Sequence, residues 1–107
     1  MEITYEEFKK MDLRVGKVVA VEEHPNADKL YILTVDIGTE QRRLVAGIKQ
    51  WYGKDDLTGK TVVVLVNLGP KTIRGVESRG MILASLAGNS LAVLTTDRDI
   101  PPGTPVS

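Results

Sequence analysis

The amino-acid sequence predicts an all-β fold: a small closed or partly closed barrel of five strands, with a short helix before it and an irregular extension after it. Three observations support this prediction. Short runs rich in Val, Ile and Leu alternate with turn-forming residues along most of the chain, a pattern typical of small barrels. Helical spacing of apolar residues is confined to the N-terminal end. The final stretch, 100–106, holds three prolines, too many for a central strand.

The expected elements follow in order along the chain. Thr4 and Glu7 have the spacing of a capping box, which predicts a helix over 4–11. We expect strands at 13–21, 30–36, 42–46, 61–66, 81–86 and 91–95, the last two joined as a hairpin. A bulge or tight bend is expected at Gly16. Residues 48–57 indicate a helical turn, 67–79 a polar loop, and 100–106 a segment that wraps over a surface or edge.

Size and composition fit one globular domain over residues 1–107. Hydrophobic residues make up 42% and charged residues 26% of the chain, as in ordinary folded proteins. There is no cysteine, which excludes disulfides and thiolate metal sites. The sequence shows neither a signal-like N-terminus nor an apolar run long enough to cross a bilayer. We therefore expect a cytoplasmic protein without a membrane partner.

The chain has few residues suited to catalysis. His24 is the only histidine, and its neighbours Pro25 and Asn26 favour a turn residue over a catalytic base. Asp55 and Asp56 could be a metal pair, but adjacent carboxylates before a glycine more often form a solvated turn. No phosphate-cradling or dinucleotide motif is present. We expect no enzyme activity, no cofactor and no metal site.

Charge is balanced overall but unevenly placed. The 14 basic and 14 acidic side chains give a formal net charge of zero, which counts against a simple nucleic-acid binder. Two stretches are nevertheless basic: residues 42–54 hold Arg42, Arg43, Lys49 and Lys54 with no acidic residue, and residues 71–79 hold Lys71, Arg74 and Arg79 against Glu77 alone. If the fold places both on one face, a neutral protein can have a positive surface.

The segment from Asn67 to Met81 has the composition of an RNA contact. It combines cations with glycines that let the backbone approach a ligand and with Asn and Ser hydrogen-bonding groups. A long surface loop with solvated charges would have the same composition. Composition alone leaves both interpretations open.

Short motifs spread over nearly the whole chain resemble a known family. They are Asp12–Val18, His24–Tyr31, Val35–Gly38, Leu44–Gly47, Asn67–Leu68, Arg74–Ser78, Gly80–Leu83 and Pro102–Thr104. The chain resembles the tRNA-binding domain found at the C-terminus, or as the beta subunit, of many methionyl-tRNA synthetases and in free-standing tRNA-binding proteins. The resemblance implies an OB-fold barrel that binds tRNA by shape and forms a homodimer through the N-terminal helix and C-terminal segment.

The resemblance also implies a set of tRNA-binding residues. The best matches to the family's tRNA-contact region are Asn67, Lys71, Arg74, Ser78 and Met81, with Lys29 and Arg42 as flanking candidates. Arg79 is a further candidate because it adds a cation to the same segment. Ser78 and Met81 could instead pin the segment to the barrel. Two positions depart from the family pattern: Gly69 stands where relatives commonly have Lys, and Arg79 where they commonly have Glu, so one cation is lost and another gained.

The expected function is therefore non-catalytic. The chain would hold or deliver tRNA for an aminoacyl-tRNA synthetase, methionyl-tRNA synthetase above all, whose catalytic chain would be a partner. An alternative is a chaperone-like peptide binder of the same fold. A generic single-strand binder is a third interpretation, but few aromatic residues are available for base stacking.

Overall fold

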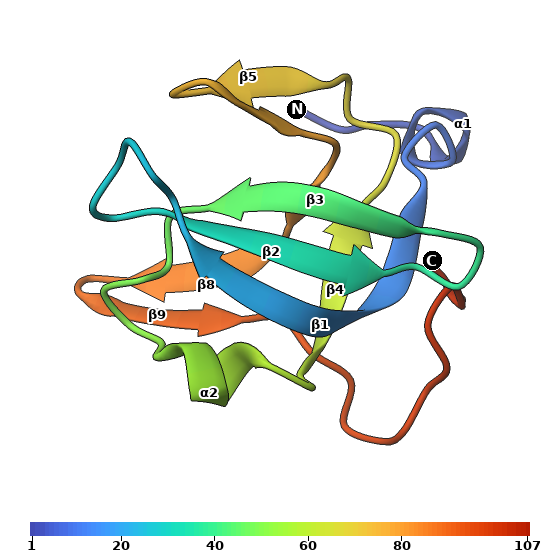
Figure 1. Cartoon of the computed structure of the whole chain (residues 1–107). Helices are drawn as coiled ribbons and strands as arrows, with labels where there is room; N and C mark the ends of the chain where they lie inside the picture. The colour runs from blue at the N-terminus through green and yellow to red at the C-terminus, as the bar shows by residue number, and fades with distance from the viewer.

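One antiparallel sheet curls into a nearly closed barrel of OB-like form, and its main strands run in the order β3-β2-β1-β4-β7 (Figure 1). Their bounds are β1 (Leu13–Glu23), β2 (Tyr31–Asp36), β3 (Gln41–Ala46), β4 (Thr61–Leu65) and β7 (Met81–Ile82). The computed structural model describes all residues from 1 to 107. These strands confirm the predicted barrel, although some of their boundaries differ from those expected.

The long strand β1 closes the barrel because it pairs with a different neighbour along each half. Its first part, from Leu13 to Lys17, pairs with β4, and the part from Lys17 to Glu23 pairs with β2. The register shifts between Val18 and Ala20, so the expected irregularity lies there and not at Gly16. Gly16 has another role: a Cβ at that position would lie 2.6 Å from Cγ1 of Val35, so only glycine allows the interior to pack this closely.

The core lies inside the barrel. Its largest fully buried side chains are Leu33, Leu44, Leu57, Val18, Val35, Val62 and Val64. Burying one such side chain contributes about 1.5–3 kcal/mol relative to leaving it exposed. On β3 the buried residues are Leu44 and Ala46, while Arg43 is exposed. Arg43 therefore points away from the core, and β3, at the end of the strand order, has an edge that can bind another element.

The smaller elements connect and flank the barrel strands. The helix α1 (Tyr5–Phe8) is shorter than predicted, but the capping box of Thr4 and Glu7 is confirmed. A single helical turn, α2 (Lys54–Leu57), lies within the expected connector, and β8 (Ala84–Ala87) and β9 (Ser90–Val93) form the expected hairpin. The tail runs along the edge of β1, where β10 (Pro105–Val106) pairs with Leu13 and Arg14. Both helices are far too short to span a bilayer.

The segment expected to be a polar loop contains a hairpin, and that expectation was wrong. Strands β5 (Lys71–Ile73) and β6 (Val76–Ser78) pair with each other. Arg74 and Gly75 form the turn between them, with φ angles of 52° and 88°. Positive φ at both central residues is typical of the type I′ turn, whose twist matches that of the flanking strands. Figure 1 shows this hairpin above β3, with its turn near the loop that joins β1 to β2.

Candidate nucleic-acid interface

The β5–β6 hairpin is fastened to the edge of β3 by main-chain and hydroxyl contacts. The Arg79 N–H donates to the Arg43 carbonyl at 3.1 Å. Ser78 Oγ accepts from the Val45 N–H at 3.0 Å and donates to the Gly80 carbonyl at 3.2 Å. Ser78 is only 4% exposed. Its hydroxyl therefore pins the hairpin to the barrel and is not presented at the surface.

Arg42 is also engaged within the protein. Its Nη1 donates to the Val66 carbonyl at 2.6 Å and to the Arg79 carbonyl at 3.4 Å. Its Nε lies 3.5 Å from Oε1 of Glu40, an ion pair without a hydrogen bond, and the side chain is 17% exposed. The guanidinium thus ties the base of the hairpin to the end of β4. It supports the surface more than it contributes a free charge to it.

Asn67 joins the start of the hairpin segment to the N-terminal segment. Its Oδ1 accepts from the Asp12 N–H at 2.9 Å, and its Nδ2 donates to the Lys10 carbonyl at 2.6 Å. Both ends of the amide are therefore occupied by the protein's own backbone. This side chain, like that of Ser78, positions the neighbouring residues.

Five exposed cations surround the hairpin, and we call them the basic hairpin surface: Lys29, Arg43, Lys71, Arg74 and Arg79. Lys29, Arg43, Lys71 and Arg74 form no ion pair, while Arg79 lies 3.8 Å from Glu40. The acids beside them are Asp28, Glu40 and Glu77. The surface is therefore locally positive although the chain is neutral, and its charges are available to an anionic ligand.

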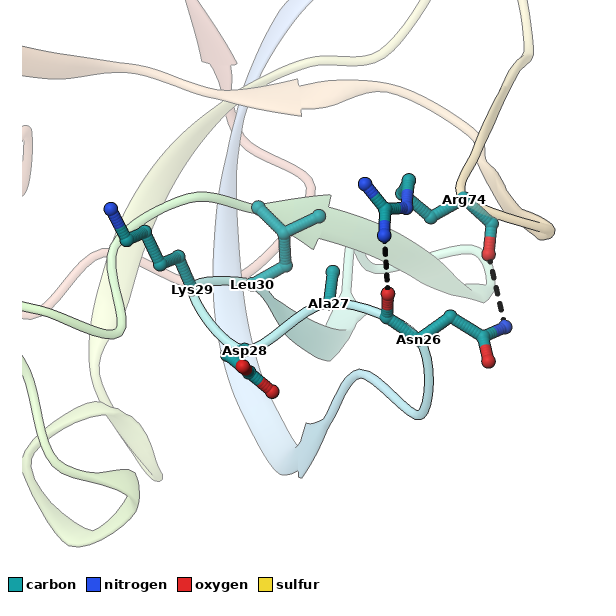
Figure 2. A pocket seen from close by; sticks show the side chains of 6 residues that line it. All are labelled: Asn26, Ala27, Asp28, Lys29, Leu30 and Arg74. Atoms are coloured by element: carbon teal, nitrogen blue, oxygen red, sulfur yellow. Dashed lines mark hydrogen bonds between the residues drawn. The ribbon is translucent and has the colours of Figure 1, made fainter.

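Three hollows lie around the hairpin, so the basic hairpin surface is not flat. The largest, about 410 Å³, lies between the loop 26–30 and Arg74 (Figure 2). A second, about 280 Å³, is lined by Gln41, Arg42, Arg43, Glu77 and Arg79. A third, about 200 Å³, is more apolar and is lined by Val45, Leu68, Gly69, Lys71, Ile73, Ser78, Gly80 and Met81. Met81 is thus partly exposed at the edge of the surface.

The two remaining cations of the basic stretch 42–54 both pair with one acidic side chain. Lys49 Nζ lies 2.6 Å and Lys54 Nζ 3.6 Å from the carboxylate of Glu23. The hydrogen bond from Lys49 lowers the pKa of Glu23, and the same hydrogen bond raises the pKa of Lys49. The fold therefore brings only the Arg42–Arg43 end of the stretch 42–54 to the hairpin. The stretch 71–79 lies there as a whole.

Arg43 is the cation that the sequence interpretation did not select. The signal for it was present, because side chains alternate between the two faces of a strand. Leu44 faces the core, so Arg43 must face outward, whereas Arg42 lies on the side of the core residues. The side-chain contacts of Arg42 agree with this alternation.

Residues 13–105 match the family model of the putative tRNA-binding domain. The chain therefore belongs to the tRNA-binding-domain family, as its motifs indicated.

The relatives of the chain include synthetases and free-standing proteins. It is 52% identical over 94% of its length to a methionine–tRNA ligase of Thermococcus onnurineus and 48% identical over 98% to one of Thermotoga maritima. It spans 14% and 17% of those ligases. Among solved structures, a methionyl-tRNA-synthetase-related protein of Pyrococcus horikoshii has a TM-score of 0.92 at 34% identity, with both chains covered completely. The CsaA chaperone protein of Picrophilus torridus has a TM-score of 0.91 at 32% identity, covering 99% of this chain and all of that one.

Proposed function

We propose that the chain is a non-catalytic module that binds folded tRNA and delivers or retains it for an aminoacyl-tRNA synthetase, methionyl-tRNA synthetase in particular. The observation that carries this proposal is the basic hairpin surface. Cations from the loop 24–30, from β3 and from the β5–β6 segment lie around one hairpin and are mostly free of acidic partners. Membership of the tRNA-binding-domain family supports the same conclusion.

The surface suits recognition of the RNA backbone. Guanidinium and ammonium groups bind phosphates, and double-stranded RNA is recognised mostly by shape and by backbone contacts. Lys71 and Arg74 are the most direct candidates, with Lys29, Arg43 and Arg79 beside them. In this proposal Arg42, Asn67 and Ser78 position those groups, and Met81 borders the contact area.

The link to a synthetase rests on the relatives. The chain matches 14% and 17% of the two methionine–tRNA ligases named above, which leaves the catalytic part elsewhere in those proteins. A module tethered to a catalytic chain raises the effective concentration of its ligand at that chain. The expected partner is therefore the catalytic chain of methionyl-tRNA synthetase, joined covalently or as a separate subunit.

A binding comparison tests the proposal. The affinity of the protein for folded tRNA would be measured beside its affinity for an unstructured RNA of equal length, at two salt concentrations. We expect tighter binding to the folded tRNA, with a slope of log affinity against log salt of roughly −2 to −4, since about three to five phosphates are neutralised. Equal affinity for the two RNAs would contradict the proposal and favour a generic single-strand binder.

We further propose that the module is a homodimer joined through its N-terminal helix and C-terminal segment. The helix α1 buries none of its residues, and the apolar side chains of Ile3, Tyr5 and Met11 around it are exposed. Light scattering at tens of micromolar should give twice the chain mass, and Tyr5→Glu should shift it toward the monomer. A monomer in the unaltered protein would contradict this arrangement.

A second candidate function, peptide binding, is favoured by one observation. The hollow of about 200 Å³ beside Met81 has the apolar side chains Val45, Leu68 and Ile73 in its wall, and two of the structurally similar proteins are named as chaperones. This function predicts binding to unfolded polypeptide that persists at high salt and weakens with Met81→Ser. Failure to bind unfolded polypeptide would exclude it.

A further inference from the structure

His24 connects the loop between β1 and β2 to the turn of the β5–β6 hairpin. The imidazole is 5% exposed, and its Nε2 lies 2.9 Å from the Ile73 carbonyl oxygen. Its Nδ1 accepts a hydrogen bond from the Asn26 N–H at 3.0 Å. We call this set of contacts, together with those between Asn26 and Arg74, the His24 latch. It joins residues that are 49 positions apart in the sequence.

Asn26 and Arg74 complete the latch by a reciprocal pair of hydrogen bonds. Asn26 Nδ2 donates to the Arg74 carbonyl at 3.2 Å, and Arg74 Nη2 donates to the Asn26 carbonyl at 3.0 Å (Figure 2). A guanidinium has five N–H donors, so Arg74 keeps donors free for a ligand. The contact with Asn26 directs this guanidinium along the wall of the hollow that Lys29 also lines.

The backbone of Arg74 needs such support. Its φ of 52° makes it the one residue other than glycine with a positive φ. Residues other than Gly, Asn and Asp rarely adopt this conformation, because the Cβ approaches the neighbouring carbonyl oxygen. Asn in place of Arg74 would relieve the turn but would remove the cation. Strain of this kind is retained where the surrounding structure enforces it, and it often marks a functional position.

The neighbours of His24 determine its tautomer. A backbone N–H can only donate, so Nδ1 facing Asn26 must carry a lone pair and no proton. The proton therefore lies on Nε2, which donates to the Ile73 carbonyl. A second proton on Nδ1 would place two N–H groups against each other and break the link to Asn26.

We propose that His24 is a positioning residue for RNA binding: in its neutral form it holds Arg74 toward the ligand, and its protonation releases Arg74. The inference rests on the proposed function, in which Arg74 contacts a phosphate of the RNA. The charged side chains near the latch are Glu22 and Glu23 at the end of β1, with Lys49 bound to Glu23, then Asp28 and Lys29 on the loop, and Lys71, Arg74 and Glu77 on the hairpin. His24 is the only histidine in the chain, so no other imidazole contributes to the pH dependence of the latch.

The test compares tRNA affinity and its salt slope in His24→Ala, His24→Gln, Arg74→Ala and the double variant His24→Ala/Arg74→Ala. At about pH 8, His24→Ala should reduce the magnitude of the slope by about one, as Arg74→Ala does, since one phosphate contact is lost. The double variant should lose no more than Arg74→Ala alone, because the two residues act through one contact. Full additivity, or an unchanged slope in a folded His24→Ala variant, would overturn the inference.

The pH dependence supplies a readout that a purely structural role would not move. When acidification protonates His24, the unaltered protein should lose about one unit of slope, although a more positive protein would otherwise bind RNA more tightly. His24→Gln replaces Nε2 by an amide nitrogen that can still donate to Ile73 and does not titrate, so its slope should stay constant. Equal pH dependence in the two proteins would overturn the inference.

A measurement without RNA separates this inference from the proposed function. The backbone amide resonances of Asn26 and Arg74 should shift together with the protonation of His24 in the unaltered protein and stay fixed in His24→Gln. If tRNA fails to bind at any pH, the proposed function is wrong while these resonances still test the latch. If the resonances do not follow His24, the latch is wrong.

Discussion

The barrel wall and the β5–β6 hairpin are held together by different forces. In the barrel wall, side chains such as Leu33, Leu44 and Val64 are completely buried, and their transfer from water stabilises the fold. In the two hairpin strands only Ser78 is buried. The hairpin is held instead by the hydrogen bond that Ser78 accepts from Val45, by the one that Arg42 donates to Arg79, and by the His24 latch.

This difference separates stability from binding. An element fixed by apolar packing would have to turn its side chains inward, whereas an element fixed by its backbone can turn charged side chains outward. The hairpin does the latter, and the cations around it stay free while Lys49 and Lys54 pair with Glu23. Substitutions in the barrel should therefore change folding, and substitutions around the hairpin should change RNA affinity.

The largest effect on folding is expected from Leu44→Ala. The side chain is fully buried in the main core cluster, so its truncation should lower the free energy of unfolding by about 2–5 kcal/mol. Denaturant unfolding measures this change. Leu86→Ala is the matched control: Leu86 is 62% exposed, so we expect a change within about 0.5 kcal/mol. Similar losses in both variants would contradict the placement of the core.

Arg42 and Arg43 are adjacent cations with opposite expected phenotypes. Arg42→Ala removes the hydrogen bonds to the Val66 and Arg79 carbonyls and should cost about 1.5–3 kcal/mol of stability. Arg43→Ala breaks no side-chain hydrogen bond or ion pair and should leave stability within about 0.5 kcal/mol. It should reduce the tRNA salt slope by about one. Thermal unfolding and tRNA titrations of both variants distinguish the two roles. Loss of stability in Arg43→Ala, with a reduced salt slope only in Arg42→Ala, would refute them.

Asn67→Ala should have a moderate effect on stability. It removes the two hydrogen bonds to the backbone of Asp12 and Lys10, each with a net contribution of about 1 kcal/mol. Asn67→Asp keeps the acceptor for the Asp12 N–H and loses the donor to Lys10, so it should lie between the unaltered protein and Asn67→Ala. Thermal unfolding gives the order of stability of the three proteins. If Asn67→Ala is as stable as the unaltered protein, these bonds do not fasten the hairpin segment to the N-terminal segment.

The smallest effect is expected from Glu23→Gln. The hydrogen bond from Lys49 lowers the pKa of Glu23 below its ordinary value of 4.5 in the folded protein. The contribution of this carboxylate to stability is therefore present above pH 4.5 and is lost as the pH falls through the lowered pKa. The pair is exposed, so the melting temperatures of Glu23→Gln and the unaltered protein should differ slightly near neutral pH and converge at acidic pH. A difference that grows on acidification would have the wrong sign.

Particular residues explain how much of the fold and of the candidate site could be predicted from the sequence. The barrel strands were predicted because runs such as 30–36 and 61–66 are long and rich in β-branched residues. The hairpin was missed because its strands have three residues each and its turn holds Arg74 before Gly75, where Asn-Gly or Asp-Gly is the usual signal. Family motifs selected the segment of the candidate site, but Arg43 required the strand alternation, and the His24 latch required the tertiary structure.

Two charge-matched variants test the central claim most directly. Lys71→Ala/Arg74→Ala removes two cations from the basic hairpin surface, and Lys49→Ala/Lys54→Ala removes two that are paired with Glu23. With both proteins folded, the salt dependence of tRNA affinity should lose about two units of slope in the first variant and stay close to that of the unaltered protein in the second. Equal losses in the two variants, or unchanged binding in the first, would contradict the assignment of the tRNA contact to this hairpin.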